Sequence, residues 1–368
     1  MVAASVGAEG VSGAPRIGLA LSGGGFRATA FGLGCLRALA DRDLLRRVRV
    51  VSGISGGSLL AAMWAYGPQE FEEFEASVIA LLRSGLQIEL ARRTFAPAAV
   101  VRNVGSVGRT LVSNRARSHS RTDSLVDALG ARPFGQRLLG DVTHPDMATV
   151  LSATDMASGN AVRFGSRVSS CSAYGVISTA VPVAEAVAAS AAFPVLLPAL
   201  TRSYEFRDRR GEVSDRQLVM TDGGVYDNLG LSPLLPGRSA HHSDHVYDLD
   251  YLIAVDAGRG RATRGEARYL PLRMKQTFDI TYGKTQDAAR TRIHLAGESG
   301  HIKGFVHTYL GMSDAKLPVP VHDLVAREQV ERYPTNFAKM AWPEIHAITV
   351  RGEQLTRVLL GHYCPSLC

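Results

Sequence analysis

A serine set between glycines is the first residue in this chain whose setting suggests chemistry. Ser55 lies in the run Gly53-Ile54-Ser55-Gly56-Gly57, which has the G-x-S-x-G spacing of a nucleophile turn. Such a turn holds the serine in a strained conformation that exposes its hydroxyl, and glycines flank it because a β-carbon does not fit there. The pattern predicts a serine nucleophile for acyl transfer.

A glycine loop upstream could serve the same reaction. Gly23, Gly24 and Gly25 stand at the start of a helical pattern, where backbone N–H groups point outward beside the positive end of the helix dipole. Next to a nucleophile, such donors can stabilise an oxyanion by roughly 3–4 kcal/mol each. The same loop also fits a dinucleotide fingerprint ending at Ala28, but that site needs an acidic residue after the second strand. The second strand ends in Val51-Ser52, which disfavours this alternative.

The elements around these two turns predict that they lie side by side. Residues 17–21 and 48–51 read as short buried strands, and residues 26–39 carry apolar side chains at helical spacing. Two strands joined by one helix form a βαβ unit, in which both strand ends reach the same edge of the sheet. We therefore expect the glycine loop and Ser55 at one carboxyl edge.

An aspartate completes the predicted site. Asp222 follows a short strand at residues 217–220 and precedes Gly223-Gly224, so it is the candidate general base. Asp256, after a strand at 251–255, is a rival, whereas Asp227 and Asn228 read as turn formers. No late histidine stands clearly at a strand end, although His294 comes nearest, and this favours a Ser–Asp dyad. Burial would have to raise the carboxylate pKa from about 3.9 for it to act as a base.

The rest of the chain reads as one large α/β domain. Residues 148–153 and 161–164 predict paired strands, a helix runs from Pro182 to before Pro194, and a further helical pattern covers residues 270–291. Ser190 in the Pro182 helix is interpreted as a small packing residue. Residues 68–141 lack strand-like alternation and predict a helical cap over the nucleophile, with a plain structural insertion as the alternative. Residues 1–14 read as a flexible leader and 15–368 as the catalytic domain.

Composition limits the other functional classes. The 368 residues are 46% hydrophobic and 20% charged, which is typical of a globular protein, and no apolar run reaches the ~18 residues of a membrane span. The N-terminus lacks the features of a signal peptide. The four cysteines do not suggest a disulfide framework, and the loop His241–His245 reads as solvated rather than metal-binding. We expect neither a metal nor a cofactor.

The net charge is +7, and the arginines are spread unevenly, with two groups that stand out along the chain. Basic faces attract anionic surfaces, including lipid headgroups, although a merely solvated face is the alternative. No nucleic-acid-binding motif is evident, so no nucleic-acid partner is expected. The two groups are Arg102, Arg109, Arg115, Arg117 and Arg121, and Arg259, Arg261, Arg264, Arg268 and Arg273.

Four motifs together resemble the patatin-like phospholipases, and the glycine loop is also similar to that of the cytosolic phospholipase A2 catalytic domain. They span residues 17–258 in the family's order: Ser22-Gly23-Gly24-Gly25-Phe26-Arg27-Ala28, Gly53-Ile54-Ser55-Gly56-Gly57, Ala189-Ser190-Ala191-Ala192-Phe193-Pro194, and Asp222-Gly223-Gly224. The resemblance implies a three-layer α/β/α fold with a mostly parallel central sheet and lipid acyl hydrolysis by a Ser55–Asp222 dyad. It also implies that Gly23, Gly24 and Gly25 form the oxyanion hole and that Arg27 helps to hold the substrate phosphate. Ser22 and Ala28 depart from the usual Asp and Gly of patatins.

The expected activity is that of a serine esterase of the phospholipase A or lysophospholipase type, acting on phospholipid or lysophospholipid at a membrane surface. The alternatives are a non-catalytic lipid-binding protein and an acyltransferase that uses the same site. A cytoplasmic protein that associates peripherally with membranes is expected, with non-classical secretion as the alternative.

Overall fold

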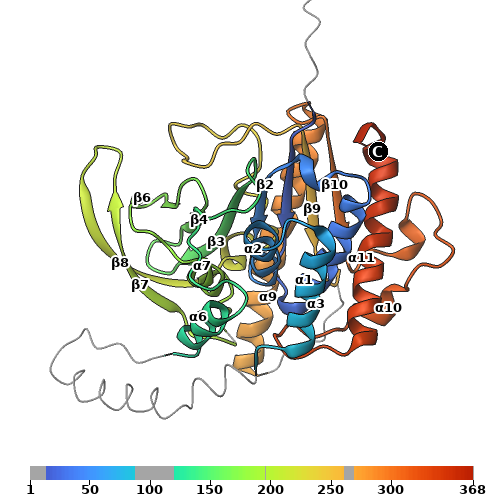
Figure 1. Ribbon diagram of the computed structural model, residues 1–368, viewed down its shortest axis with the longest axis horizontal. Coiled ribbons are helices and arrows are strands. Elements are labelled where there is room, and N and C mark those ends of the chain that lie inside the picture. Colours follow the sequence, from blue (N-terminus) through green and yellow to red (C-terminus); the bar gives the residue numbers. More distant parts are fainter. Residues whose placement is uncertain (1–13, 88–119, 195, 261–268, 368) are drawn as a thin grey trace, which may run out of the picture.

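One mixed β-sheet forms the centre of the protein (Figure 1). The computed structural model describes residues 14–87, 120–194, 196–260 and 269–367. The strand order in the sheet is β10-β9-β1-β2-β3-β4-β5-β6-β7-β8. The strands are β1 Ile17–Leu21, β2 Val48–Gly53, β3 Ala148–Asp155, β4 Ala161–Gly165, β5 Ser170–Cys171, β6 Gly175–Ile177, β7 Leu200–Arg207, β8 Val213–Asp222, β9 Tyr251–Asp256 and β10 Gly304–Tyr309.

The sheet has a parallel half and an antiparallel half. Strands β10, β9, β1, β2 and β3 pair in parallel, whereas every pairing from β3 through β4, β5, β6 and β7 to β8 is antiparallel. Strand β8 also pairs with the end of β3, so this half curls back on itself like part of a barrel. The prediction of a mostly parallel sheet is therefore wrong, because every strand from β3 to β8 pairs with its neighbour in the antiparallel direction, including β6 and β7, which the segment carrying α7 connects.

Helices cover both faces of the parallel half. They are α1 Gly25–Ala40, α2 Gly56–Tyr66, α3 Phe71–Ser84, α6 Arg121–Ala131, α7 Val183–Ser190, α8 Gly224–Asp227, α9 Leu270–Glu298, α10 Arg327–Val330 and α11 Trp342–Tyr363, with short 3-10 turns at Leu45–Arg47, Asp314–Lys316 and Pro365–Leu367. Helices α1, α2, α3 and α11 pack together on one face, and α9 lies across the other (Figure 1).

Alternation along β1 divides the core between these two faces. Leu19 and Leu21 join the larger apolar cluster under α1 and α11, whereas Ala20 joins a smaller cluster that includes Ile293 and Ala296 of α9. Successive strand residues point to opposite faces, so a strand buried on both faces is apolar throughout. This explains why residues 17–21 read as a continuous apolar run.

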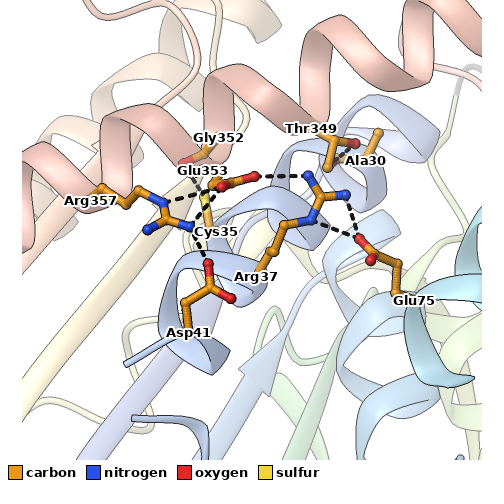
Figure 2. A network of polar contacts seen from close by, with 9 residues as sticks. All are labelled: Ala30, Cys35, Arg37, Asp41, Glu75, Thr349, Gly352, Glu353 and Arg357. Carbon is orange, nitrogen blue, oxygen red and sulfur yellow. Dashed lines mark hydrogen bonds and ion pairs between the residues drawn. The ribbon is translucent and has the colours of Figure 1, made fainter. Parts of the chain in front are cut away.

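Glycines allow α1 and α11 to approach closely. A β-carbon on Gly34 would lie 1.8 Å from the carbonyl oxygen of Thr349, so only glycine fits at this contact. Arg37 of α1 then bridges Glu75 of α3 and Glu353 of α11, as Figure 2 shows. These contacts fix the helix that begins at the glycine loop.

The predicted insertion at 68–141 begins and ends in helices that pack on the core. Helix α3 contacts α1 and α2, and α6 contacts α7. Residues 88–119 of the predicted cap and 1–13 of the predicted leader lie outside the described residues. The cap and the leader therefore remain predictions.

Candidate active site

Ser55 occupies a strained turn between β2 and α2. Its backbone has φ 52° and ψ −119°, in the left-handed region that residues other than glycine rarely adopt. A β-carbon on Gly56 would lie 2.0 Å from the carbonyl oxygen of Gly25, so the turn needs glycine directly after the serine. Ser55 is 7% exposed and lines the cavity described below. Strain of this kind is typical of active sites.

Ser190, at the end of α7, holds the Ser55 turn in place. Its hydroxyl accepts a hydrogen bond from the Ser55 backbone N–H at 3.0 Å and donates one to the carbonyl oxygen of Ser152 at 2.6 Å. It also shares a 2.7 Å hydrogen bond with the hydroxyl of Ser58. Ser190 is fully buried, so these contacts satisfy the capacity of its hydroxyl. The interpretation of Ser190 as a packing residue omitted this hydrogen-bonding role.

The residues after Ser190 hold the aspartate in the same way. The carbonyl oxygen of Ala192 accepts hydrogen bonds from the Asp222 N–H and from the Thr221 hydroxyl, both at 3.0 Å. One short segment at the end of α7 therefore positions both candidate catalytic residues.

Asp222 ends β8 beside the nucleophile turn. It pairs with Ala153, two positions beyond the β3 residue that pairs with Gly53 of β2, so it reaches the edge where Ser55 lies. Its Oδ1 accepts a hydrogen bond from the Gly224 N–H at 2.7 Å, and its carboxylate lines the same cavity as Ser55, whose hydroxyl is near enough to lower the pKa of the carboxyl group. The structure thus brings together the two residues that the sequence paired.

Burial changes the acidity of Asp222. The residue is 2% exposed, and loss of solvent raises the pKa of its carboxylate to about 6, although the hydrogen bonds from Gly224 and Ser55 act in the opposite direction. A carboxylate with this pKa is a better proton acceptor than one in water, and it is still ionised at neutral pH.

The glycine loop gives two open amides at the cavity. Gly24 and Gly25 have positive φ angles of 146° and 58°, which turn the chain from β1 into α1. The Gly23 N–H already donates to the carbonyl oxygen of Asn228 at 3.0 Å. No hydrogen bond among the described residues engages the amides of Gly24 and Gly25. Of the three predicted oxyanion donors, the Gly24 and Gly25 N–H groups are therefore available to a substrate, whereas the Gly23 N–H already donates to Asn228.

Arg27 lies in the first turn of α1, and its guanidinium is largely held by the protein. Its Nε donates to the carbonyl oxygen of Ala257 at 3.1 Å and its Nη1 to that of Tyr333 at 2.8 Å. Burial, with the nearby charge of Arg259, lowers its pKa to about 10, so it stays charged at neutral pH. Arg27 lines the cavity, and its role toward a substrate phosphate remains a prediction.

All six predicted site residues line one cavity of about 880 Å³. This volume is at the upper end of the range for ligand pockets. The wall combines apolar side chains with several cationic ones and includes no histidine among the described residues. Besides the six, the lining includes Ala191, Phe193, Leu196, Asn228, Arg259, Gln276, Ile280, Tyr282, Lys284, Asp287, Arg290 and Phe337.

Two cavity residues were missed or misread in the sequence. Asn228, read as a turn former, reaches the cavity with its Oδ1 buried and without a hydrogen-bond partner among the described residues. Tyr282 of α9 brings its hydroxyl close to Gly224, since a β-carbon there would lie 2.7 Å from the oxygen. Burial and the nearby charge of Asp222 raise the pKa of Tyr282 well above its ordinary value. Neither residue carries a local signal that indicates the site.

Asp256, the alternative candidate for the general base, is bound by other residues. Its Oδ2 lies 2.6 Å from Nη2 of Arg290 and 3.3 Å from Nε2 of His307, and its Oδ1 accepts from the Gly258 N–H at 2.7 Å. Although burial opposes ionisation, the contacts with His307 and Arg290 hold its pKa well below the usual range. A low-pKa carboxylate in an ion pair is a poor proton acceptor.

The other candidates of the sequence lie away from this site. His294 of α9 stacks edge-on against Phe305. Within the described residues, no group of three or more His, Cys, Asp or Glu side chains is arranged to hold a metal ion. None of the helices in the described part of the chain is long and apolar enough to cross a bilayer.

The fold has counterparts among solved structures. Human GIVD cytosolic phospholipase A2 matches with a TM-score of 0.52 at 14% identity, over 94% of this chain and 61% of that one. VipD from Legionella pneumophila matches with a TM-score of 0.44 at 17% identity, over 96% of this chain and 68% of that one. This chain thus spans about three fifths of the phospholipase A2, and at such identities the likeness concerns the fold alone.

The sequence itself identifies the family. No curated protein matches the chain. The family model for patatin-like phospholipase matches residues 19–235, which include the glycine loop, the Ser55 turn and Asp222. Because this match covers more than half of the sequence, the chain belongs to the patatin-like phospholipase family.

Proposed function

We propose that this protein is a serine acyl hydrolase that cleaves fatty acyl esters of phospholipids or lysophospholipids. Members of its family are lipid acyl hydrolases. The observation that carries the proposal is that the strained Ser55 and the buried Asp222, a carboxylate whose pKa is raised to about 6, line the same cavity. This is the arrangement of an activated nucleophile and its base.

In the first half-reaction, Asp222 takes the proton of the Ser55 hydroxyl while Oγ attacks the ester carbonyl carbon. The amides of Gly24 and Gly25 donate to the oxyanion of the tetrahedral intermediate. Collapse of the intermediate breaks the bond to the ester oxygen. The leaving alcohol, which is a lysophospholipid when the substrate is a phospholipid and a glycerophosphodiester when it is a lysophospholipid, takes the proton from Asp222 and leaves an acyl-Ser55.

In the second half-reaction, Asp222 takes a proton from water as the water oxygen attacks the acyl carbon. The second intermediate collapses, Ser55 recovers its proton from Asp222, and the fatty acid is released. An ester suits this dyad because an alkoxide leaves with less help than an amine.

The cavity wall supports a lipid substrate. Phe193, Leu196, Ile280 and Phe337 give it apolar surface for an acyl chain, and Arg27 and other cations lie on the same wall. An anionic headgroup and a hydrocarbon tail match these two kinds of surface. Arg27 is proposed to hold the phosphate through whichever donors remain beyond its two carbonyl contacts.

Single substitutions test the dyad. Ser55→Ala and Asp222→Asn are expected to reduce turnover of a soluble fluorogenic acyl ester by at least about 1,000-fold, since each removes a member of one catalytic unit. Ser84→Ala, an exposed serine of α3, is the matched control and should turn over the ester normally. Full turnover by either site variant would refute the assignment.

Two further measurements separate the alternatives. Human GIVD cytosolic phospholipase A2 has been solved with methyl γ-linolenyl fluorophosphonate, so a fluorophosphonate probe is a suitable reagent here. Labelling that depends on Ser55 supports an activated nucleophile, and absence of labelling would favour a lipid-binding protein without activity. Product analysis with an added alcohol acceptor distinguishes hydrolysis from acyl transfer.

A further inference from the structure

The N-terminal turns of α9 expose a cluster of large apolar side chains. Tyr269 is 74% exposed, Leu270 68%, Leu272 54% and Met274 65%. Elsewhere in the described part of the chain, exposed large apolar residues are scattered singly, which is normal for a soluble surface. Four within six positions surround the N-terminal end of the helix, and we refer to Tyr269, Leu270, Leu272 and Met274 as the α9 patch. A patch of this kind indicates an interaction site.

The α9 patch is continuous with the cavity wall. Leu272, Gln276 and Ile280 are four residues apart, so they share one face of the helix. Gln276 and Ile280 line the cavity, and Leu272 lies about 12 Å from Ile280 along the axis. Figure 1 shows α9 (orange) on the far side of the sheet, with its N-terminal end at the bottom of the view. The face that borders the cavity therefore continues outward as exposed apolar surface.

The charges near this face are mainly positive. Arg259 and Lys284 are exposed at the cavity wall, and Arg273 is exposed between two residues of the α9 patch. The neighbouring acids Asp287 and Glu331 are ion-paired with Arg290 and Arg327. Cations that flank an apolar patch attract a surface that is both anionic and able to accept apolar side chains.

From these observations we infer that the α9 patch docks on the surface of an anionic phospholipid bilayer, an inference that rests on the proposed function for its substrate. Leu272 and Met274 insert at the level of the acyl chains, and the amphipathic ring of Tyr269 lies among the headgroups. A lipid can then pass along the Leu272–Ile280 face into the cavity without crossing water. A protein partner or a second copy of the chain on this patch is the outcome that the tests must distinguish.

Vesicle flotation tests the docking directly. The protein carries Ser55→Ala so that lipid is not consumed, and the vesicles contain phosphatidylcholine and phosphatidylserine. The variant Leu272→Glu/Met274→Glu is expected to bind at least about tenfold more weakly, because two apolar side chains no longer enter the bilayer. Glutamate is a good helix former and is favourable near a helix N-terminus, so α9 should persist.

Matched variants separate the apolar contribution from the change in charge. Val213→Glu/Leu295→Glu alters net charge equally at exposed apolar residues outside the patch, which are 54% and 56% exposed, and it should retain binding to within about twofold. Leu272→Ser/Met274→Ser leaves the charge unchanged and should still weaken binding. Equal loss in the Val213/Leu295 control, or unchanged binding in both Leu272/Met274 variants, overturns the inference.

Activity measurements separate this inference from the proposed function. With Ser55 intact, Leu272→Glu/Met274→Glu should hydrolyse a soluble short-chain ester at the normal rate but vesicle lipid at least about tenfold more slowly. If the wild type cleaves no ester yet floats with vesicles through Leu272 and Met274, the proposed function fails and the docking stands. A wild-type dimer that the variant dissociates, with flotation unchanged, assigns the patch to a second copy and overturns the docking.

Discussion

The backbone N–H of Ser55 donates a hydrogen bond to the hydroxyl of Ser190, 3.0 Å away and 135 positions along the chain. A strained turn persists only where its surroundings hold it. Because Ser190 also donates to the carbonyl oxygen of Ser152, it ties the turn to the end of β3. Ser190 is thus a positioning residue for the candidate nucleophile.

Replacing this hydroxyl should loosen the turn. Ser190→Ala leaves the buried Ser55 N–H without its partner, so we expect a loss of about 1–3 kcal/mol in the free energy of unfolding. We also expect kcat for a soluble ester to fall roughly tenfold or more, since a misplaced nucleophile is sensitive to small shifts. KM and the pH midpoint should be unchanged, because the cavity wall and Asp222 are untouched. Urea unfolding and steady-state kinetics measure these quantities, with Ser84→Ala as the control.

The raised pKa of Asp222 sets the pH dependence of turnover. The carboxylate must be ionised to accept the Ser55 proton, and its pKa is about 6. We expect kcat/KM for a soluble ester to rise with pH through about 6 and to level off above it. A pH profile of the free enzyme measures this midpoint. A midpoint near 4, the value of an exposed carboxylate, would contradict the effect of burial.

Because its pKa is raised, ionised Asp222 should lower the free energy of unfolding at neutral pH. The native state binds a proton more tightly than the unfolded chain, so the favourable contribution is complete below about pH 4 and is lost as pH rises through about 6. The rise in pKa from 3.8 to about 6 corresponds to about 3 kcal/mol at neutral pH. Asp222→Asn should therefore be inactive yet more stable by up to this amount at pH 7.

Urea unfolding at pH 7 and pH 4 checks this expectation, because the gain should shrink at the lower pH. A weaker hydrogen bond from the Gly224 N–H to the neutral amide offsets part of the gain. If the variant is less stable than wild type at pH 7, the contacts of the Asp222 carboxylate outweigh the free-energy cost of burying its charge.

The arrangement of the candidate site could be predicted from the sequence because its parts are local turns. Glycines that permit positive φ or close approach mark the loop at Gly24, the turn at Ser55 and the end of β8. The order of the predicted elements put the glycine loop and the Ser55 turn at one edge of the sheet. In the structure, β1 and β2 are parallel neighbours, as this requires. Asp222 reached the same edge by a different route, through an antiparallel pairing with Ala153.

What could not be anticipated depends on contacts between distant segments. Nothing in the local sequence indicates the hydrogen bonds of Ser190 or the closeness of Tyr282 to Gly224. Small and aromatic residues are usually interpreted as packing residues. In the curled half of the sheet, β3, β4 and the end of β8 were predicted, but β5, β6 and β7 were missed. Strand β7, Leu200–Arg207, alternates buried and exposed residues only over part of its length and carries several polar side chains, so it gave no strand signal.

Asp256 is expected to serve the fold rather than the chemistry. Asp256→Asn removes the buried ionic partner of Arg290, which keeps only its contact with the partly exposed Asp287, and this should cost up to roughly 3 kcal/mol of stability. Because the pKa of Asp256 lies well below its ordinary value, its contribution is present above about pH 4 and is lost as pH falls further. The difference between variant and wild type in urea unfolding should therefore shrink in acid. Residual ester turnover with a midpoint still near 6 would separate this role from that of Asp222.

The space around Gly224 leads to the last expectation. A β-carbon at this position would lie 2.7 Å from the Tyr282 hydroxyl and from Asn228 Oδ1, and 2.8 Å from Asp222 Oδ1. In this chain Gly224→Ala should therefore displace the base and lower kcat/KM roughly 10–100-fold. Tyr282→Phe alone removes one of the crowding atoms and should have a smaller effect.

A double-mutant cycle in soluble-ester kinetics tests this steric account. In Gly224→Ala/Tyr282→Phe the missing hydroxyl leaves room for the new methyl group, so the double variant should recover part of the activity that Gly224→Ala loses. Contacting residues give coupling energies of about 0.5–3 kcal/mol in such cycles. Simple additivity of the two substitutions would mean that Tyr282 does not crowd this position, and the loss would then lie with Asn228 and Asp222.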